Sequence, residues 1–342
     1  MINSINYFLL ALCFLSNCQS KTTHSTLSNK LDSLVIKEKN SCKYANLSTN
    51  TLPFGSELIT KDFVDKFMDY NIALEEKVDI SESAILFQQV ANYTDSLFSY
   101  MYSNRDSTCI LDLSISNQFA YYDEYISYFT DREIDSSRMF IINKIDFSDS
   151  ISILLVVGNL DFTNQYCHAI TTDKEENIID VLNIAYTGSV IELSHSWKGF
   201  YINKNGFIYT KSFTTIDDDV HLNNAQVYQV KNTGKIIRFF TKKDGNYINK
   251  TEKGKIKNHH RSGEWIDMRY DHSINKYIYL VSYFEDGIPV GKWNYYQLKQ
   301  DTIFEESKDY QIIKEIKNPR KGDLIYNETY QNGKLLNIEF KK

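Results

Sequence analysis

The stretch FEDGIPVGKWNYY, residues 284–296, decides the fold of the C-terminal part of the chain. It holds an Asp-Gly pair, a second glycine four residues later, and then a tryptophan and two tyrosines. Asp286-Gly287 suits a tight two-residue turn, because such a turn needs positive φ at both central residues. Gly291 allows a bend and leaves room for the large ring of Trp293. The stretch therefore predicts a β-hairpin in which the glycines and the tryptophan are scaffold.

Related elements occur on both sides of this stretch. Gly263-Glu264-Trp265 precedes Gly291-Lys292-Trp293 by 28 residues, and Asn332-Gly333 repeats the turn signal near the C-terminus. A single hairpin cannot bury its aromatic rings alone, so neighbouring hairpins must stack. Residues 244–342 are therefore expected to form an antiparallel sheet of β-hairpin repeats.

The same elements resemble the MORN-like repeats, in the degenerate form written roughly Y-x-[ND]-G-[K]-x-x-G-x-W-x-x-Y. The resemblance covers under a third of the chain. It implies that each unit is a β-hairpin and that the units stack into an extended twisted sheet. The turn residues of the repeats are Gly263, Gly287, Gly291 and Gly333.

The repeat region also carries the candidate binding residues. Tyrosine and tryptophan are enriched at protein interfaces. An aromatic face on an open β array is therefore a candidate binding surface, alongside the scaffold interpretation. Its candidate residues are Trp265, Tyr270, Tyr283, Trp293 and Tyr296. Tyr277, Tyr279, Val281 and Tyr283 alternate to one side of a predicted strand, whereas Ile278, Leu280 and Phe284 take the other.

The composition of the chain favours a folded, strand-rich protein. Of 342 residues, 42% are hydrophobic and 14% are aromatic, with 25 Tyr and 20 Phe but only 3 Pro. Such a chain can bury a core, and aromatic and β-branched side chains pack well on a pleated sheet. The net charge of −6 argues against a nucleic-acid partner, because non-specific binding needs a basic surface.

The N-terminus MINSINYFLLALCFLSNC, residues 1–18, contains an apolar run over residues 7–15. This run matches a signal-peptide core and is too short to span a bilayer as a helix. Its end, Leu15-Ser16-Asn17-Cys18, resembles the lipobox of bacterial lipoproteins. The resemblance implies that residues 1–17 are removed and that Cys18 is acylated, which anchors the chain to membrane lipid in the cell envelope, with the outer membrane favoured. The alternative is a buried N-terminal element with an ordinary cysteine.

The remaining cysteines give no metal-binding pattern. Cys13 would leave with the signal peptide, and Cys42, Cys109 and Cys167 would stay in the mature chain. None of them has CxxC spacing, so no zinc site is predicted. One disulfide with a free thiol, and three buried thiols, both stay open as interpretations.

Residues 18–51 and 52–243 are expected to differ in order. The first range is dominated by Ser, Thr, Asn and Lys, which is typical of a flexible tether. The second should begin with two helices, one capped by Thr60 and one capped by Ser81 or Ser83. The buried face of the second helix is predicted from the spacing of Leu86, Val90, Tyr93, Leu97 and Met101.

From about Ile110, short apolar runs separated by turn residues predict an antiparallel meander. The runs are residues 140–142, 151–157, 178–184 and 200–213. Asn205-Gly206 is the strongest hairpin signal and predicts a type I′ turn. Residues 151–240, with Thr171-Thr172-Asp173 and a closing Gly234-Lys235-Ile236, resemble a region of uncharacterised secreted bacterial proteins. That resemblance implies no particular chemistry.

Three groups could carry chemistry, and each has a simpler structural interpretation. Cys167 and His168 are adjacent in a predicted strand and would point to opposite faces, which argues against a nucleophile pair. Asp217-Asp218-Asp219 with His221 lacks the spacing of a calcium loop. His259-His260 and His272 are expected on the surface of a hairpin. No catalytic residue, metal or cofactor is therefore predicted.

Taken together, these patterns predict an α+β protein. A mixed N-terminal domain with an antiparallel sheet would precede the MORN-like hairpin repeats. The expected function is a non-enzymatic, lipid-anchored envelope protein that binds a protein or glycan through the repeat sheet. Two alternatives stay open: an antitoxin-like repeat protein that neutralises a partner toxin, as the resemblance to this repeat variant implies, and an envelope hydrolase with no recognisable motif.

Overall fold

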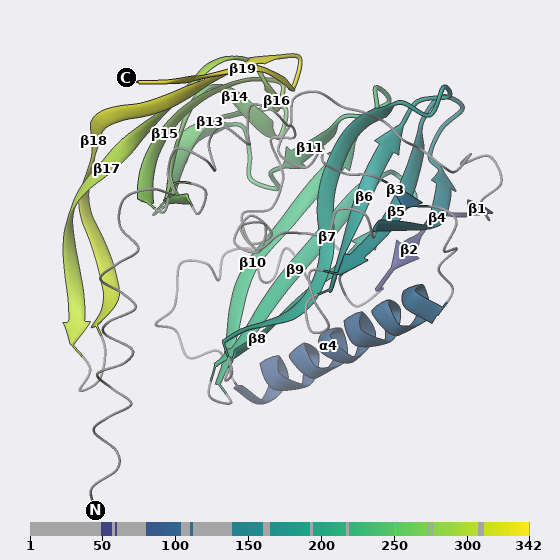
Figure 1. The fold of residues 1–342 in the computed structure, drawn as a ribbon. Helices are drawn as coiled ribbons and strands as arrows, with labels where there is room; N and C mark the ends of the chain where they lie inside the picture. The colour runs from purple at the N-terminus through teal and green to yellow at the C-terminus, as the bar shows by residue number, and fades with distance from the viewer. Residues whose placement is uncertain are drawn as a thin grey trace, which may run out of the picture.

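The computed structural model describes residues 49–56, 59, 80–103, 110–111, 139–159, 165–191, 194–216, 219–249, 251–271, 274, 276–306 and 311–341. Over these residues the protein is mostly β, with two open sheets and a single helix (Figure 1). The predicted α+β class is therefore corrected to mostly β. Most of the described residues follow the alternating or continuous apolar patterns of strands, and α4 (Ile80–Ser103) is the one helix among them. The helix predicted after Thr60 lies outside the described residues.

The first sheet has eleven described strands. They are β1 (Thr49–Asn50), β2 (Phe54–Gly55), β3 (Ile110–Leu111), β4 (Met139–Asp146), β5 (Ser152–Asn159), β6 (Gln165–Thr172), β7 (Ile178–Ile191), β8 (Ser194–Ile202), β9 (Phe207–Ile216), β10 (Asp219–Val230) and β11 (Ile236–Phe239). From β4 to β11, strands adjacent in the chain pair antiparallel, which confirms the predicted meander. β1 pairs parallel with β4, so Thr49 and Asn50 belong to this sheet rather than to a tether ending at residue 51.

The hairpin between β8 and β9 is present, but its turn is not of the predicted type I′. Of Asn205 and Gly206, only Gly206 has positive φ, at 73°. The N–H of Gly206 donates to the carbonyl of Asn203 at 3.1 Å, which is the three-residue turn with a left-handed glycine at its end. The side chain of Asn203 explains the difference. Its Oδ1 accepts from the N–H groups of Asn205 at 2.9 Å and Phe207 at 3.0 Å.

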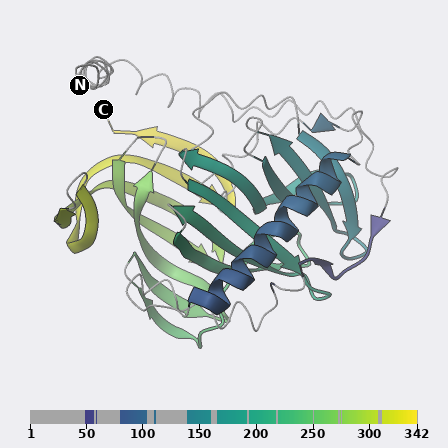
Figure 2. The same ribbon diagram turned by 90° about the horizontal axis from the view of Figure 1, so that it is seen from below.

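The helix α4 (Ile80–Ser103) lies across the first sheet (Figure 2). It confirms the second predicted helix, but it begins at Ile80, before either predicted cap. Among its described side chains, Val90, Ala91, Thr94 and Phe98 are buried, whereas Tyr93 and Leu97 of the predicted face are half-buried. The side chains of Leu86 and Met101 lie outside what the structure describes. The helix is therefore rotated slightly from the orientation that the spacing predicts.

Gly199 of β8 allows α4 to lie close to the sheet. A Cβ atom at this position would be 2.6 Å from Cδ1 of Ile59 and 3.0 Å from Cγ1 of Val90. Phe98 of α4 joins the main core of this sheet, which contains apolar side chains from β4 to β11. The helix and the meander therefore share one hydrophobic core.

The second sheet has eight strands among the described residues and follows the first in the chain. They are β12 (Gly245–Ile248), β13 (Glu252–Lys257), β14 (His260–Asp271), β15 (Lys276–Glu285), β16 (Ile288–Pro289), β17 (Gly291–Glu306), β18 (Gln311–Gln331) and β19 (Lys334–Phe340). All pairings in it are antiparallel. The chain passes from one sheet to the other between Phe239 and Gly245.

A 28-residue structural repeat is visible in this second sheet. Gly263 and Gly291 have nearly the same φ, 69° and 67°. The indole Nε1 of Trp265 donates to the carbonyl of Lys255 at 3.1 Å, and that of Trp293 donates to the carbonyl of Tyr283 at 3.1 Å. Both bonds reach back ten residues. The two Gly-x-Trp segments therefore share the glycine φ and the indole hydrogen bond, although different rings contact the two tryptophans.

The turns of this sheet need positive φ at two successive residues. Asp286 and Gly287 have φ of 47° and 80°, and Asn332 and Gly333 have 50° and 78°. Both turns lie where the Asp-Gly and Asn-Gly pairs predict them. A third pair, Asn258-His259, has φ of 52° and 64° and contains no glycine.

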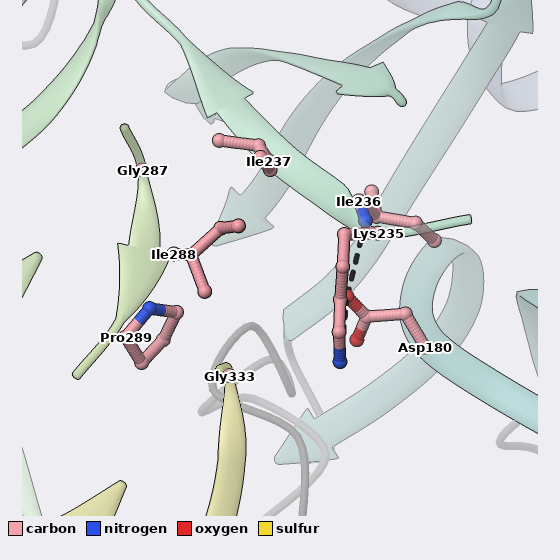
Figure 3. A pocket seen from close by; sticks show the side chains of 8 residues that line it. All are labelled: Asp180, Lys235, Ile236, Ile237, Gly287, Ile288, Pro289 and Gly333. Atoms are coloured by element: carbon pink, nitrogen blue, oxygen red, sulfur yellow. Dashed lines mark hydrogen bonds and ion pairs between the residues drawn. The ribbon is translucent and has the colours of Figure 1, made fainter. Parts of the chain in front are cut away.

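The two sheets meet at β11 and the turns of the second sheet. Figure 3 shows Asp180 of β7 and Lys235, just before β11, facing Gly287, Ile288, Pro289 and Gly333 of the second sheet. The space that these residues line has a volume of about 10 Å³. Such a space holds about one water molecule. Gly287 lies so close to β11 that an added Cβ would be 2.1 Å from Cγ2 of Ile237.

Asp180 holds β11 onto β7 at this junction. Its Oδ2 accepts from the N–H of Ile236 at 3.0 Å, and Lys235 Nζ lies 4.0 Å away. Burial raises the pKa of Asp180 to about 6, although Lys235 and the backbone N–H groups act to lower it.

Candidate functional site

The two tryptophans of the candidate binding residues lie in the core of the second sheet. Trp265 is 0% exposed and Trp293 is 5% exposed. Trp265 packs against Phe240, and Trp293 packs against Tyr330 with ring centroids 4.5 Å apart. This burial removes both tryptophans from any exposed binding face and leaves the tyrosines.

The tyrosines of β15 lie on the opposite side of the sheet from this core. The even-numbered residues Ile278, Leu280 and Phe284 are buried, whereas Tyr279 and Tyr283 are half-buried and Tyr277 is 36% exposed. The predicted alternation of β15 is therefore present, and its tyrosine side is the outer side of the sheet.

Strand register extends this outer side across four strands. Tyr279 is directly opposite Met268 of β14 and Tyr296 of β17, and Tyr296 is opposite Leu324 of β18. Residues directly opposite one another in an antiparallel pair point to the same face. We call the set Tyr277, Tyr279, Tyr283 and Tyr296 the tyrosine face.

Charged side chains hold the rings of the tyrosine face in place. The hydroxyl of Tyr283 donates to Oε2 of Glu264 at 2.9 Å, and this bond raises the pKa of Tyr283 above its usual value. Burial, with Glu264 nearby, raises the pKa of Tyr279. Lys321 Nζ lies 4.1 Å from the ring centroid of Tyr296 in a cation–π contact. The phenols of Tyr279 and Tyr283 therefore stay neutral at physiological pH.

A depression of about 400 Å³ adjoins the tyrosine face at Tyr283. It lies between the turn at Asn258-His259 and the turn at Asp286-Gly287, and we call it the inter-turn depression. It is lined by Asn258, Ser262, Gly263, Tyr283, Glu285 and Asp286, among others. Its volume is within the range of small-molecule sites.

The other chemistry-bearing groups do not form a site in the described part of the chain. Cys167 is buried, which raises the pKa of its thiol and makes it inert. His168 is also buried and lies 5.1 Å from the ring of Tyr166. Within the described ranges, no three His, Cys, Asp or Glu side chains gather as a metal site.

His260 corrects the expectation that the histidine pair lies on the hairpin surface. It is 2% exposed and accepts from Lys231 Nζ at 2.8 Å through Nε2, while Nδ1 lies 3.3 Å from the carbonyl of Arg238. The turn at Asn258-His259 directs His260 towards the first sheet. His259 itself is exposed at the turn.

Several predicted residues lie outside what the structure describes. Tyr270 pairs with Tyr277 in the β-ladder, but its side chain is not described. The chain segments that hold Cys18, Cys42, Cys109, His272 and Asp217-Asp218 are likewise outside the described residues.

The sequence analysis missed a buried ion cluster at the sheet junction. Arg238 of β11 makes two hydrogen bonds to the carboxylate of Glu252, at 3.0 and 3.1 Å. Arg261 bonds the same carboxylate and also Asp267 at 3.2 Å, and its guanidinium lies 4.6 Å from the ring centroid of Trp265. No short sequence pattern predicts this cluster, because its members come from both sheets.

The sequence analysis also missed the turn at Asn258-His259. A signal was available, since this pair precedes Asp286-Gly287 by 28 residues, the same offset that relates the two Gly-x-Trp segments.

Comparison with known proteins adds no assignment. No protein-family model matches the chain, and neither a curated protein nor a solved structure matches it significantly. No helix in the described part of the chain has the length and apolar character needed to cross a membrane.

Proposed function

We propose that this protein is a lipid-anchored, non-enzymatic binding protein of the cell envelope, most consistent with the outer membrane. Its second sheet is a MORN-like repeat array that presents the tyrosine face to a protein or glycan partner. The observation that carries the proposal is the cross-strand alignment of Tyr279 and Tyr296 on the outer side of a sheet whose other side is a packed core.

The physical character of the tyrosine face supports binding. Tyrosine offers a rigid apolar ring and a polar hydroxyl. Because its side chain has few rotatable bonds, ordering it on association costs little conformational entropy. Glu264 and Lys321 already restrain these rings, so less order has to be imposed when a partner docks.

The lipid anchor rests on the lipobox-like segment that ends at Cys18. Acylation at this residue would place the second sheet at a membrane surface, within reach of envelope proteins and glycans. The test is palmitate incorporation with membrane fractionation, for the native chain and Cys18→Ala. Label and membrane partition that depend on Cys18 support the proposal. An unlabelled native chain would refute the anchor and bring the antitoxin-like interpretation forward.

The tyrosine face is tested with a double variant, Tyr279→Ala with Tyr296→Ala. Both side chains lie on the outer side of the sheet, so the fold should persist. The matched control is Tyr100→Ala, because Tyr100 is 61% exposed on α4 and far from this sheet in the chain. Cross-linked partners from the membrane fraction should be lost in the double variant and retained in the control. Equal recovery of cross-linked partners by the double variant and by the control would refute the assignment of the tyrosine face as a binding surface.

A further inference from the structure

The inter-turn depression has walls that are fixed before any ligand binds. One wall is the turn at Asn258-His259, whose two N–H groups donate to the carboxylate of Asp244 at 2.8 and 3.1 Å. The other wall is the turn at Asp286-Gly287, which is packed against Ile237. Both turns hold positive φ at successive residues. A preorganised cavity loses little conformational entropy when it is filled.

The inner surface of the depression combines an aromatic platform with open space. Tyr283 lines it, and the hydroxyl of this residue is held by Glu264. Gly263 has no atom within 4 Å of the position where a Cβ would stand.

Both neutral and charged polar groups surround the ring of Tyr283, and together they offer hydrogen-bond donors and acceptors. Asn258 supplies an amide and Ser262 a hydroxyl, while Glu285 and Asp286 supply carboxylates and Lys257 an amine. Two carboxylates against one amine disfavour a phosphate or another anion. The many polar groups disfavour a lipid chain, because each would lose its hydration without a partner.

We propose that the inter-turn depression binds a neutral saccharide unit. The C–H face of the sugar ring packs on Tyr283, and its hydroxyls exchange hydrogen bonds with Asn258, Ser262 and the carboxylates of Glu285 and Asp286. This inference deepens the proposed function, because it names a ligand class for one end of the same surface. The competing ligand is a basic peptide side chain, which the two carboxylates would also attract.

The test is titration of the full chain with neutral hexose and N-acetylhexosamine oligomers, and separately with a Lys/Arg-rich peptide. Tyr283→Ala should weaken oligosaccharide binding about tenfold, which corresponds to about 1.4 kcal/mol of lost ring packing. Tyr100→Ala is the matched control, since it removes an exposed tyrosine ring from α4, outside the tyrosine face and the depression. It should leave the affinity within about twofold.

A second variant, Ser262→Leu, fills the depression without removing the tyrosine ring and should also abolish binding. Its urea midpoint and that of Tyr283→Ala show whether either has lost its fold. Saccharide affinity should change little between ~0.01 M and ~1 M salt, because no net charge is neutralised.

Three results would overturn the inference. One is that no oligosaccharide of the panel binds. Another is that the peptide binds instead, in a salt-sensitive way, and is lost in the double variant Glu285→Gln with Asp286→Asn, which keeps a turn-compatible Asn-Gly pair. The third is that Tyr100→Ala weakens saccharide binding as much as Tyr283→Ala. In each case the proposed function still stands or falls on the separate partner assay with Tyr279 and Tyr296.

Discussion

The ring of Trp265 lies directly on the backbone of Gly254. A Cβ atom built at Gly254 would be 2.3 Å from Cδ2 of the indole, and Trp265 is 0% exposed. Gly254 is on β13 and Trp265 is on β14, so the missing side chain of one strand makes room for the large ring of its neighbour. The same ring contacts Phe240 and Tyr247, which ties β12 and the end of the first sheet to this core.

Gly254→Ala should lower the free energy of unfolding by about 1–3 kcal/mol, because the added methyl overpacks the site of a buried ring. Urea unfolding measures the change. The control is the double variant Gly254→Ala with Trp265→Leu, in which the clash is gone. A double-mutant cycle should give a coupling free energy well above zero, and strict additivity of the two changes would contradict the contact.

Gly287 and Gly333 allow conformational strain to be separated from steric crowding. Both occupy the second turn position, with φ of 80° and 78°, so alanine is strained equally at both. An added Cβ would be 2.1 Å from Ile237 at Gly287, but at Gly333 its nearest neighbour is the flexible Nζ of Lys235 at 3.3 Å. Gly333→Ala should therefore cost about 1–2 kcal/mol, and Gly287→Ala about 1–3 kcal/mol more. Equal urea midpoints for the two variants would argue against close packing of the sheets at Ile237.

The carboxylate of Glu252 should contribute strongly to stability. Burial alone would raise the pKa of Glu252, but Arg238 and Arg261 outweigh it and lower that pKa to about 2. Glu252→Gln leaves Arg238 without its carboxylate partner and leaves Arg261 with Asp267 as its remaining anion, so it should cost about 3–5 kcal/mol. A folded pKa below the usual value of 4.5 means that this contribution is present above pH 4.5 and is lost as the pH falls towards 2.

A matched control for this ion cluster lies on the protein surface. Glu339 pairs with Lys292 at 3.0 Å, but both side chains are more than half exposed. Glu339→Gln should leave the urea midpoint unchanged within error, because solvent screens an exposed pair. Equal changes in urea midpoint for Glu252→Gln and Glu339→Gln would contradict a buried, stabilising ion cluster at Glu252.

His260 should make the sheet junction sensitive to acid. Burial lowers the pKa of His260, and Lys231 lowers it further, although the carbonyl of Arg238 and the charge of Asp286 act to raise it. Since the folded pKa lies below the usual value of 6.5, the folded state disfavours the protonated ring. Stability from this group is therefore complete above pH 6.5 and falls as the pH drops below that value.

The measurement is the free energy of unfolding as a function of pH, for the native chain and for His260→Gln. Glutamine keeps one donor and one acceptor but cannot gain a proton, so it should flatten the curve just below pH 6.5. Asp180 acts in the opposite sense, since a pKa raised from 3.8 to about 6 favours folding as the pH falls through that window. A native curve that does not change on substitution of His260 would contradict the assigned contact with Lys231.

Much of the local structure was predictable from short patterns. The Asp-Gly and Asn-Gly pairs locate two turns of the second sheet, because few residues tolerate consecutive positive φ. The alternation of Tyr279 and Leu280 assigns them to opposite faces of β15. Asn205-Gly206 marks its hairpin correctly, yet the turn type depends on Asn203, whose side chain reaches two backbone N–H groups.

The candidate site was only partly predictable for a related reason. Trp265 and Tyr283 both belong to an aromatic repeat, and sequence spacing ranks them alike. One fills the core and the other lines a depression, because the core residues cover only one side of the sheet. His260 was predicted at the surface of a hairpin, but it is buried because β11 packs against it.

The sequence by itself determined that residues 244–342 form antiparallel hairpins with glycine-containing turns and two distinct faces. These features depend on φ preferences and on side-chain alternation, which act over a few residues. Only the tertiary structure decided which face is buried, where the inter-turn depression lies, and that Arg238 meets Glu252 across the sheet junction. Burial and ion pairing depend on what packs against a residue, and here the partners come from distant parts of the chain.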